Sequence, residues 1–450
     1  MGPLPLLALL ALTTSAERLT LDRALALAAK RNADVALANL DRDAAAVEVR
    51  GSYEGVLPRL DLTASVGHQY QGAQEQAAVV QNPAPPPPFI REVTTYGEND
   101  FGQYQFALNF NWTFFDGLAT WNLIDASKRR AEAAHKQFDE TSLRIAFLVT
   151  QRFYELVRQE RGLDVRKEAA DLSAELVKRA DALFAAGRGT RADTFSARVN
   201  LGNDQLAVQT QLAAVVRART DLAVVLGLSS DAGLEVEIPD TVTGAHPLSV
   251  EEPPPLPNLL SQARTARPAL SALKLSIDAA DSDIARARAA YWPTLSLQAS
   301  YQKATPDFSG SFGVFGDPTN QATAVAQITL AYNIFAGGDT KTGVERAEVQ
   351  ARRAQTQLEQ AEETVAQEVT NARSQVETLA SSLALQQTVL DNSSKDLGFA
   401  RERLEAGVGS QLEVRDAALK LSQAKLAWVS NIIDLVVARA DLNRAVGGTL

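Results

Sequence analysis

The chain has 450 residues, a formal net charge of −10 and no cysteine. The negative charge argues against nucleic acid as a partner. The absence of cysteine excludes disulfides, thiolate metal sites and a lipid-modified cysteine. No apolar run beyond the N-terminus reaches about 18 residues, which excludes a membrane-spanning helix. The three histidines, His68, His135 and His246, lie far apart, so we expect neither a bound metal nor a cofactor.

The N-terminus is typical of a secretory signal sequence. Residues 5–12 form a short apolar core, and residues 14–16 offer a small-residue cleavage site. No lysine or arginine precedes the core, and a buried N-terminal helix is the alternative. From residue 20 the pattern becomes helical, and a second helix is expected from about residue 34 to residue 53.

Two stretches of the chain repeat each other at a constant spacing of 220 residues. The most distinctive shared motif is Ala-Gly-x-Gly followed by a hydroxyl residue, at residues 186–190 and again at residues 406–410. The same spacing pairs Ala197 with Ala417. A match of this length indicates internal duplication. We therefore expect a signal sequence at 1–16, a first repeat at 17–228, a linker rich in proline and acid at 229–257, and a second repeat at 258–450.

Each repeat contains two segments in which apolar and polar residues alternate with the period of a β-strand. The segments begin near Pro58 and Tyr104 in the first repeat, and near Pro293 and Thr323 in the second. The stretch between the first two, from Gln71 to Gln103, contains a proline-rich run and is expected to be a structureless loop. One strand face should hold Phe106, Phe110, Trp112, Phe114, Leu295, Leu297, Ile328 and Leu330, and the other Asn109, Asn111, Gln298 and Gln327.

Strands of about 10 residues with one apolar face have the length of tilted transmembrane β-strands. On that interpretation the apolar face meets lipid and the polar face lines a lumen. An ordinary soluble sheet packed on helices is the alternative, and it would bury the same face against protein. Four strands cannot close a barrel in lipid, where an open edge leaves backbone groups unsatisfied. The chain would then have to oligomerise: a dimer supplies eight strands and a trimer supplies twelve.

A very long helix is expected after each second strand, at residues 118–185 and 339–405, because no proline interrupts either stretch. Few of the side chains in these stretches are large and apolar, so only a narrow stripe is available for burial, as in a coiled coil. At each Ala-Gly-x-Gly tip the chain reverses, with glycine in the left-handed conformation. The returning helices are expected to end near Gly227 and Gly447.

Acidic residues follow both tips at helix-capping positions. Ser410-x-x-Glu413 is the capping-box pattern, and Thr190-x-x-Asp193 is an aspartate variant of it. Asp193 and Glu413 therefore have a structural role at the helix start, whether or not they have another. Asp416 lies beyond the cap, three residues after Glu413, and these two carboxylates share one helix face.

The order of these motifs, present in both halves, resembles the TolC family of outer-membrane efflux proteins. The resemblance covers about residues 19–448 and is carried by three pairs of motifs: the Pro-led strand starts at residues 57–60 and 292–295, the Phe-x-Gly strand exits at residues 115–117 and 335–337, and the two tips. It implies an α+β membrane protein: a homotrimer with a twelve-stranded outer-membrane β-barrel and a periplasmic α-helical tunnel. It also implies an exit duct in the bacterial outer membrane that docks onto a periplasmic adaptor and an inner-membrane pump or exporter.

The resemblance also implies site residues. The tunnel entrance matches Asp193, Glu413 and Asp416, and the tips for adaptor docking match Gly187, Gly189, Thr190, Gly407, Gly409 and Ser410. Under threefold symmetry Glu413 and Asp416 would form a ring of carboxylates that attracts cations. Some relatives have a tyrosine and an arginine that link neighbouring helices at the closed tip, where this chain has Leu404 and Gly409. Arg188, Arg191 and Arg415 are candidate substitutes.

No catalytic constellation accompanies these features, because neither a triad-like context nor a P-loop spacing occurs. We expect a transport conduit and not an enzyme. The alternative is a non-transport coiled-coil scaffold with a small soluble β-sheet, which would stay soluble on membrane fractionation. The cargo, whether drug, metal or protein, is left open because the partner pump would set the specificity.

Overall fold

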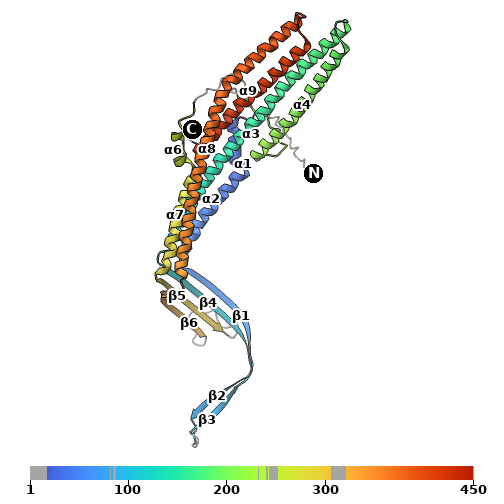
Figure 1. Cartoon of the computed structure of the whole chain (residues 1–450). Coiled ribbons are helices and arrows are strands. Elements are labelled where there is room, and N and C mark those ends of the chain that lie inside the picture. Colours follow the sequence, from blue (N-terminus) through green and yellow to red (C-terminus); the bar gives the residue numbers. More distant parts are fainter. Residues whose placement is uncertain are drawn as a thin grey trace, which may run out of the picture. The chain divides into compact units, whose positions relative to one another are not determined.

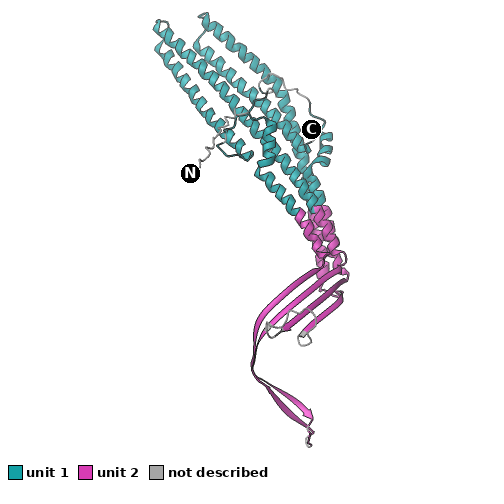
Figure 2. Ribbon diagram, turned by 180° about the vertical axis from the view of Figure 1, so that it is seen from behind, with its two compact units in different colours: residues 1–45, 130–276, 354–450 teal, residues 46–129, 277–353 magenta. Residues whose placement is uncertain are grey.

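The computed structural model describes residues 18–81, 83–84, 88–231, 233–239, 242, 252–305 and 321–448. The predicted signal sequence at 1–16 lies outside these residues. The chain divides into two compact units, coloured separately in Figure 2. Unit 1 consists of residues 1–45, 130–276 and 354–450, and unit 2 of residues 46–129 and 277–353.

The main sheet belongs to unit 2 and combines strands from both repeats (Figure 1). Its four strands are antiparallel and lie in the order β1-β4-β5-β6. Their bounds are β1 Arg59–Gln71, β4 Asn99–Phe115, β5 Thr294–Thr305 and β6 Gln321–Ala331. Strand β1 therefore forms one edge of the sheet and strand β6 the other.

The strand register separates apolar from polar residues, as the alternation predicted. Trp112 is opposite Leu297, and Leu297 is opposite Ile328, so these three side chains share one face. One residue along, Asn111 is opposite Gln298, and Gln298 is opposite Gln327. The Gln327 amide nitrogen donates to the Gln298 amide oxygen at 3.0 Å. The two predicted faces are thus confirmed across the sheet.

One residue of the predicted apolar face falls outside this register. The partners of β4 change from Thr113 opposite Ser296 to Phe115 opposite Leu295, which leaves a bulge at Phe114. The bulge interrupts the strict pairing after Thr113, but Phe114 keeps its predicted neighbour: its ring lies edge-on to Trp112, with ring centroids 5.5 Å apart.

The prediction of a structureless loop from Gln71 to Gln103 is wrong. Two further strands, β2 (Gln74–Gln81) and β3 (Phe89–Tyr96), pair there as a separate antiparallel sheet, and β4 already begins at Asn99. Valine, isoleucine and threonine in these segments favour extended backbone. The prolines fall between the two strands, where no ladder donor is needed.

The predicted helix bounds are confirmed to within a residue or two. The helices before the sheet strands are α1 Leu21–Arg31, α2 Ala33–Ser52 and η1 Tyr53–Gly55 in the first repeat, and α6 Leu256–Ala266, α7 Pro268–Arg288 and η2 Ala289–Tyr291 in the second. The helices after the strands are α3 Ala119–Ala185 and α4 Arg191–Val225, then α8 Asp339–Glu405 and α9 Gln411–Val446. None of the described helices combines the length and the apolar character that a membrane crossing requires.

Narrow apolar stripes bury the long helices against one another in unit 1. Val149, Phe153 and Leu156 of α3 are completely buried in a cluster that also takes in residues of α1, α4 and α9. A second cluster joins Val369 of α8 to Leu435 of α9. Both clusters run along helix faces, so the coiled-coil prediction holds.

Equivalent joints tie the short helices to the ends of the returning helices. Asn32, between α1 and α2, donates from its side chain to the Val225 carbonyl at the end of α4, at 2.8 Å. Arg267, between α6 and α7, donates to the Arg444 carbonyl at the end of α9, also at 2.8 Å. Arg267 is only 5% exposed and pairs in addition with Glu140 at 2.8 Å. The second joint is therefore a buried ion pair and the first is neutral.

Candidate functional site: the hairpin tips and the adjoining helix seam

Both hairpin tips end their first helix on a glycine in the left-handed region. Gly187 has φ 67° and Gly407 has φ 77°, as the motif predicted. The chain then closes back on the helix end: the Arg188 N–H donates to the Leu183 carbonyl at 2.8 Å, and the equivalent bond of the second tip is 3.0 Å long. These bonds satisfy carbonyls that the helix leaves without partners.

The second glycine of each tip leaves little room for a side chain. A Cβ on Gly189 would lie 3.2 Å from the Leu183 Cβ, and one on Gly409 would lie 2.9 Å from the Leu404 nitrogen. A side chain at either position would push the returning helix away from the end of the first. Gly409 therefore has a steric role at the second tip.

The first tip has a complete capping box. The Asp193 N–H donates to the Thr190 hydroxyl oxygen at 3.2 Å, and the Thr190 N–H donates to the Asp193 carboxylate at 3.1 Å. The Thr190 hydroxyl also donates to that carboxylate at 2.6 Å. These bonds hold the pKa of the Asp193 carboxyl below its ordinary value.

The second tip has only half of this arrangement. The Glu413 N–H donates to the Ser410 hydroxyl oxygen at 3.2 Å. The Glu413 carboxylate lies 3.6 Å from the Arg403 guanidinium nitrogen, at the end of the preceding helix. The predicted reciprocal bond is thus replaced by an ion pair across the hairpin, because the longer glutamate side chain reaches the neighbouring helix.

The three predicted entrance acids do not form one cluster within a single chain. Asp193 helps to line a small cavity of about 100 Å³ that it shares with Gln411, Leu412 and Arg415 of α9. Asp416 does not line this cavity, and its carboxylate pairs with Lys420 at 2.7 Å. The hydrogen bond and the charge of Asp416 raise the pKa of the Lys420 ammonium group. Asp416 is therefore balanced by a cation on its own helix.

Arg415 makes the strongest polar contact near the tips, and it makes this contact inside the chain. Its guanidinium group forms an ion pair with Asp204 of α4 and donates to the Ser173 hydroxyl of α3 at 2.7 Å. The Ser173 hydroxyl in turn donates to Asp204 at 2.5 Å. Both charged side chains are less than a quarter exposed. Arg415 thus ties α9 to both helices of the first hairpin.

Arg191 and Leu404 were the other candidates for tip closure, and each contacts residues of its own chain. Arg191 stacks over the Phe184 ring at 6.0 Å from its centroid, within the first tip. The carbonyl oxygen of Leu404 accepts a bond from the Arg179 guanidinium group at 2.8 Å, which links α3 to the end of α8. The sequence offered no signal for Arg179, because its partner is a backbone atom 225 residues away.

A seam between α3 and α9 continues away from the tips, and we call it the α3–α9 seam. Lys425 forms an ion pair with Glu168, and farther along Arg158 pairs with Asp434 at 2.5 Å. Residue numbers rise along α9 as they fall along α3, so the two helices are antiparallel. A cavity of about 280 Å³ in the seam is lined on the α9 side by Arg415, Ala418, Leu419, Ser422, Gln423 and Leu426.

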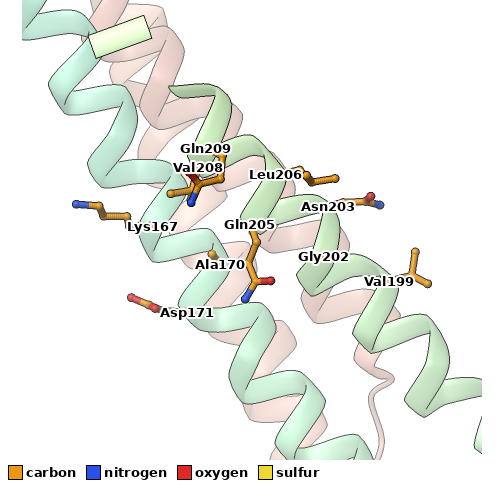
Figure 3. A pocket seen from close by; sticks show the side chains of 10 residues that line it. All are labelled: Lys167, Ala170, Asp171, Val199, Gly202, Asn203, Gln205, Leu206, Val208 and Gln209. Atoms are coloured by element: carbon orange, nitrogen blue, oxygen red, sulfur yellow. The ribbon is translucent and has the colours of Figure 1, made fainter. Parts of the chain in front are cut away.

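A larger groove of about 930 Å³ opens along the outside of α3 and α4. Figure 3 shows Val199, Asn203 and Leu206 of α4 pointing away from α3. Val199 and Leu206 are 63% and 67% exposed. Among the described residues, nothing covers these two apolar side chains of α4.

Aromatic residues gather where the sheet strands meet the helices in unit 2. Trp121, Trp292 and Tyr332 are more than half exposed, and the Trp112 indole N–H donates to the Val56 carbonyl at 3.0 Å. At the same junction Gly117 has φ 68°, and a Cβ there would lie 2.6 Å from the Ala289 carbonyl oxygen. Among the described residues no group of three or more acids or histidines could hold a metal ion.

Comparison with known proteins gives a family and a fold. The family described as outer membrane efflux protein matches residues 24–228 and 259–448. SrpC, the solvent efflux pump outer membrane protein of Pseudomonas putida, is 29% identical over 182 residues, which are 40% of this chain and 38% of SrpC. BepC, an outer membrane efflux protein of Brucella suis, is 23% identical over 341 residues, which are 76% of this chain and 71% of BepC. The chain thus matches well under half the length of SrpC.

Solved structures cover almost the whole chain. CusC superposes with a TM-score of 0.77 at 18% identity, over 95% of this chain and 92% of CusC. The open-state MtrE outer membrane channel of Neisseria gonorrhoeae gives 0.75 at 19% identity, over 95% of this chain and 89% of MtrE. At this level of identity the comparison shows a shared fold, and the α+β fold class expected from the sequence is confirmed.

Proposed function

The chain belongs to the outer membrane efflux protein family, and we propose that it is the outer-membrane exit duct of a tripartite efflux or type I secretion system. In this role it passes substrates from a periplasmic adaptor and an inner-membrane pump or exporter to the cell exterior. Family membership confirms the resemblance inferred from the strand and tip motifs, and with it the expected location in the bacterial outer membrane. The chain division stays as proposed: signal sequence 1–16, repeats 17–228 and 258–450, and linker 229–257.

The uncovered apolar face of the main sheet is the observation that carries this proposal. Leu60, Leu62, Ile328 and Leu330 are between 63% and 68% exposed. A soluble sheet would bury such a face against helices, as the scaffold alternative requires. Lipid contact on this face and a water-filled lumen on the opposite, polar face account for both.

The two edges of the sheet support a trimer. Strands β1 and β6 each lack a partner on one side within the described chain. In lipid such edges must be paired, and the β6 edge of one copy can meet the β1 edge of the next. Three copies of four strands give the twelve-stranded barrel that the family resemblance implied. The exposed Trp121, Trp292 and Tyr332 suit the headgroup region at the end of this barrel.

The tips remain the proposed adaptor-docking points, and the acids near them the proposed entrance. The docking surface comprises Gly187, Gly189, Thr190, Gly407, Gly409 and Ser410. Of the entrance candidates Asp193, Glu413 and Asp416, the first is held in a cap and the others face cations of the same chain. We therefore propose a weaker acidic ring than the carboxylates alone would give, with Asp416 as its member farthest from the cap.

A strand-face experiment tests the channel directly. Leu330→Arg should cost about 2–4 kcal/mol of folding free energy, because it places a charge on the lipid face. Gln327→Arg, on the lumen face of the same strand, should assemble and raise anion preference in planar-bilayer conductance. Membrane fractionation of the two variants, with wild type as reference, measures assembly. If Leu330→Arg inserts normally and Gln327→Arg does not, the faces are reversed.

A further inference from the structure

We propose that the cavity in the α3–α9 seam is a binding site for a small anionic amphiphile, a molecule with an apolar body and one carboxylate group. The cavity has a volume of about 280 Å³ and is lined by α3, α4 and α9 of one chain. The efflux function proposed above does not require such a site, and the site needs no residue of a second copy. Arg166 is assigned to the carboxylate, and the alanine and leucine side chains beside it to the apolar body.

Three charged side chains line this cavity, and two of them neutralise each other. Arg415 and Asp204 form an ion pair, in which the second guanidinium nitrogen lies 3.2 Å from the other carboxylate oxygen. Ser173 completes the group through bonds to both residues. The remaining charge belongs to the guanidinium group of Arg166. The lining as a whole therefore carries an excess positive charge, which attracts an anion.

The guanidinium group of Arg166 has an amide, and not a carboxylate, as its neighbour. Among the described residues its only polar partner is the amide oxygen of Gln211, to which the Arg166 Nε donates at 3.0 Å. Arg166 is partly buried. A charge that has lost part of its water is costly unless it is paired, and such groups are normally paired. The position therefore calls for an anionic partner.

The bond to Gln211 orients the guanidinium group and leaves its two terminal nitrogens for that partner. Gln211 is itself held in place, because its amide nitrogen donates to the Gln159 carbonyl at 2.9 Å and to the Gln159 side-chain oxygen at 2.7 Å. Gly162 leaves room for this amide, since a Cβ there would lie 2.9 Å from its nitrogen. An oriented guanidinium group can bind both oxygens of one carboxylate.

An apolar wall extends through the cavity from Arg166 toward the hairpin tips. The lining of α9 alone runs from Arg415 to Leu426, which is about 16 Å of helix. The cavity is therefore elongated, with the guanidinium group of Arg166 at one end and the Arg415–Asp204 pair at the other. The apolar side chains between these ends are Ala169, Leu172, Ala207, Ala418 and Leu419.

The size and the charge of the cavity together select the class of ligand. Its volume is at the lower end of the range for ligand sites, which begins at roughly 300 Å³, so the ligand is small. An organic cation would meet the excess positive charge. A purely apolar molecule would leave the Arg166 guanidinium group covered but without an anion. A narrow alkyl or aryl-alkyl carboxylate satisfies both the wall and the charge.

A ligand in this cavity would hold the two helical hairpins together. It would contact α3 and α4 of the first hairpin and α9 of the second at the same time. A ligand that binds only the assembled arrangement stabilises that arrangement. Binding should therefore oppose any separation of α9 from the first hairpin.

Isothermal titration calorimetry with 4-phenylbutyrate tests the site. The full chain is held in lipid nanodiscs, and empty nanodiscs give the background heat. We expect saturable binding of one 4-phenylbutyrate per chain. The alcohol 4-phenylbutanol has the same apolar body without the charge, so it should bind roughly 10-fold more weakly or worse.

Three variants separate the charge from the cavity. Arg166→Gln should weaken the binding of 4-phenylbutyrate by roughly 10–100-fold, because it removes the hydrogen bonds to the carboxylate. Lys167→Gln is the matched control: it removes one positive charge from the next residue, which is exposed and does not line this cavity, and should leave the affinity unchanged. Ala207→Leu fills the cavity without a change of charge and should abolish binding.

Circular dichroism shows whether each variant folds, and native mass spectrometry records the number of copies. Should Ala207→Leu fail to fold, Ala169→Leu fills the same cavity from α3. Trimers of wild type that do not bind 4-phenylbutyrate would overturn the site and leave the channel standing. Equal affinity of wild type and Arg166→Gln, or unchanged binding in the folded filling variant, would also overturn it. Single chains that bind with the expected pattern would support the site and contradict the proposed channel.

Discussion

The two helical hairpins descend from one sequence and hold their neighbours by different means. The second hairpin meets the first through ion pairs: Arg415 with Asp204, Lys425 with Glu168, and Arg158 with Asp434. The counterpart positions in the other repeat are uncharged in every case. The joint at Arg267 is likewise an ion pair, and its counterpart at Asn32 is neutral.

This difference indicates a division of labour between specificity and assembly. Ion pairs contribute more to the choice of partner than to net stability, because desolvation offsets their attraction. Within a chain they fix which hairpin lies beside which. The uncharged counterpart positions suit contacts that require no charge partner, because burial of an apolar stripe is favourable by itself. Each experiment below compares a residue of one repeat with its counterpart in the other.

The largest expected effect is at the two joints. Arg267→Ala leaves Glu140 largely buried without its cation and should cost about 3–5 kcal/mol. Asn32→Ala removes a neutral bond from the equivalent place and should cost about 1–3 kcal/mol. Chemical denaturation followed by circular dichroism of the helices measures both. Equal losses of unfolding free energy in the two variants would show that the charged Arg267 contributes no more than the neutral Asn32.

The next effect concerns Arg415 and its counterpart Phe195. Arg415→Met removes the cation from Asp204 and should destabilise the contact between hairpins by about 1–3 kcal/mol. Phe195→Met should leave the stability of the single chain nearly unchanged, since Phe195 is 59% exposed. Chemical denaturation of the two variants measures the difference. A loss of stability in Phe195→Met as large as that in Arg415→Met would contradict the contrast.

The smallest effect is local and depends on pH. The pKa of Asp193 is held below its ordinary value of 3.8 by the bonds from Thr190, so the cap contributes fully above that pH. The contribution is lost as the pH falls through the lowered pKa, because protonation ends the carboxylate's role as acceptor. Amide hydrogen exchange at the first tip should accelerate in that range, and Asp193→Asn should abolish the pH step. Glu413→Gln, at the half-formed box, should change exchange at its tip less.

Local sequence signals were sufficient for the elements and insufficient for their contacts. Glycines at 187 and 407, hydroxyl caps after them and uninterrupted stretches fixed the helix ends, because these depend on neighbours within a few residues. The strand faces followed from alternation alone. The sequence does not predict the β2–β3 pair, because the proline run in this stretch favours a loop.

The candidate site was predicted only in part, for a related reason. The cap at Asp193 follows from four consecutive residues, and the structure contains it. The contacts of Arg415, Arg179 and Arg267 join residues more than 100 positions apart. The neighbours of each helix are determined by packing along whole apolar stripes. No local sequence pattern predicts these neighbours. The duplication supplies that information indirectly, because each contact in one repeat predicts a position in the other.

A cryo-electron microscopy reconstruction of the detergent-solubilised protein tests the central claim most directly. The account predicts three copies around one axis, with the β6 edge of each copy paired with the β1 edge of the next. The Arg415–Asp204 pair should remain within each copy. A particle with another number of copies, or a trimer in which these strand edges stay unpaired, would contradict it.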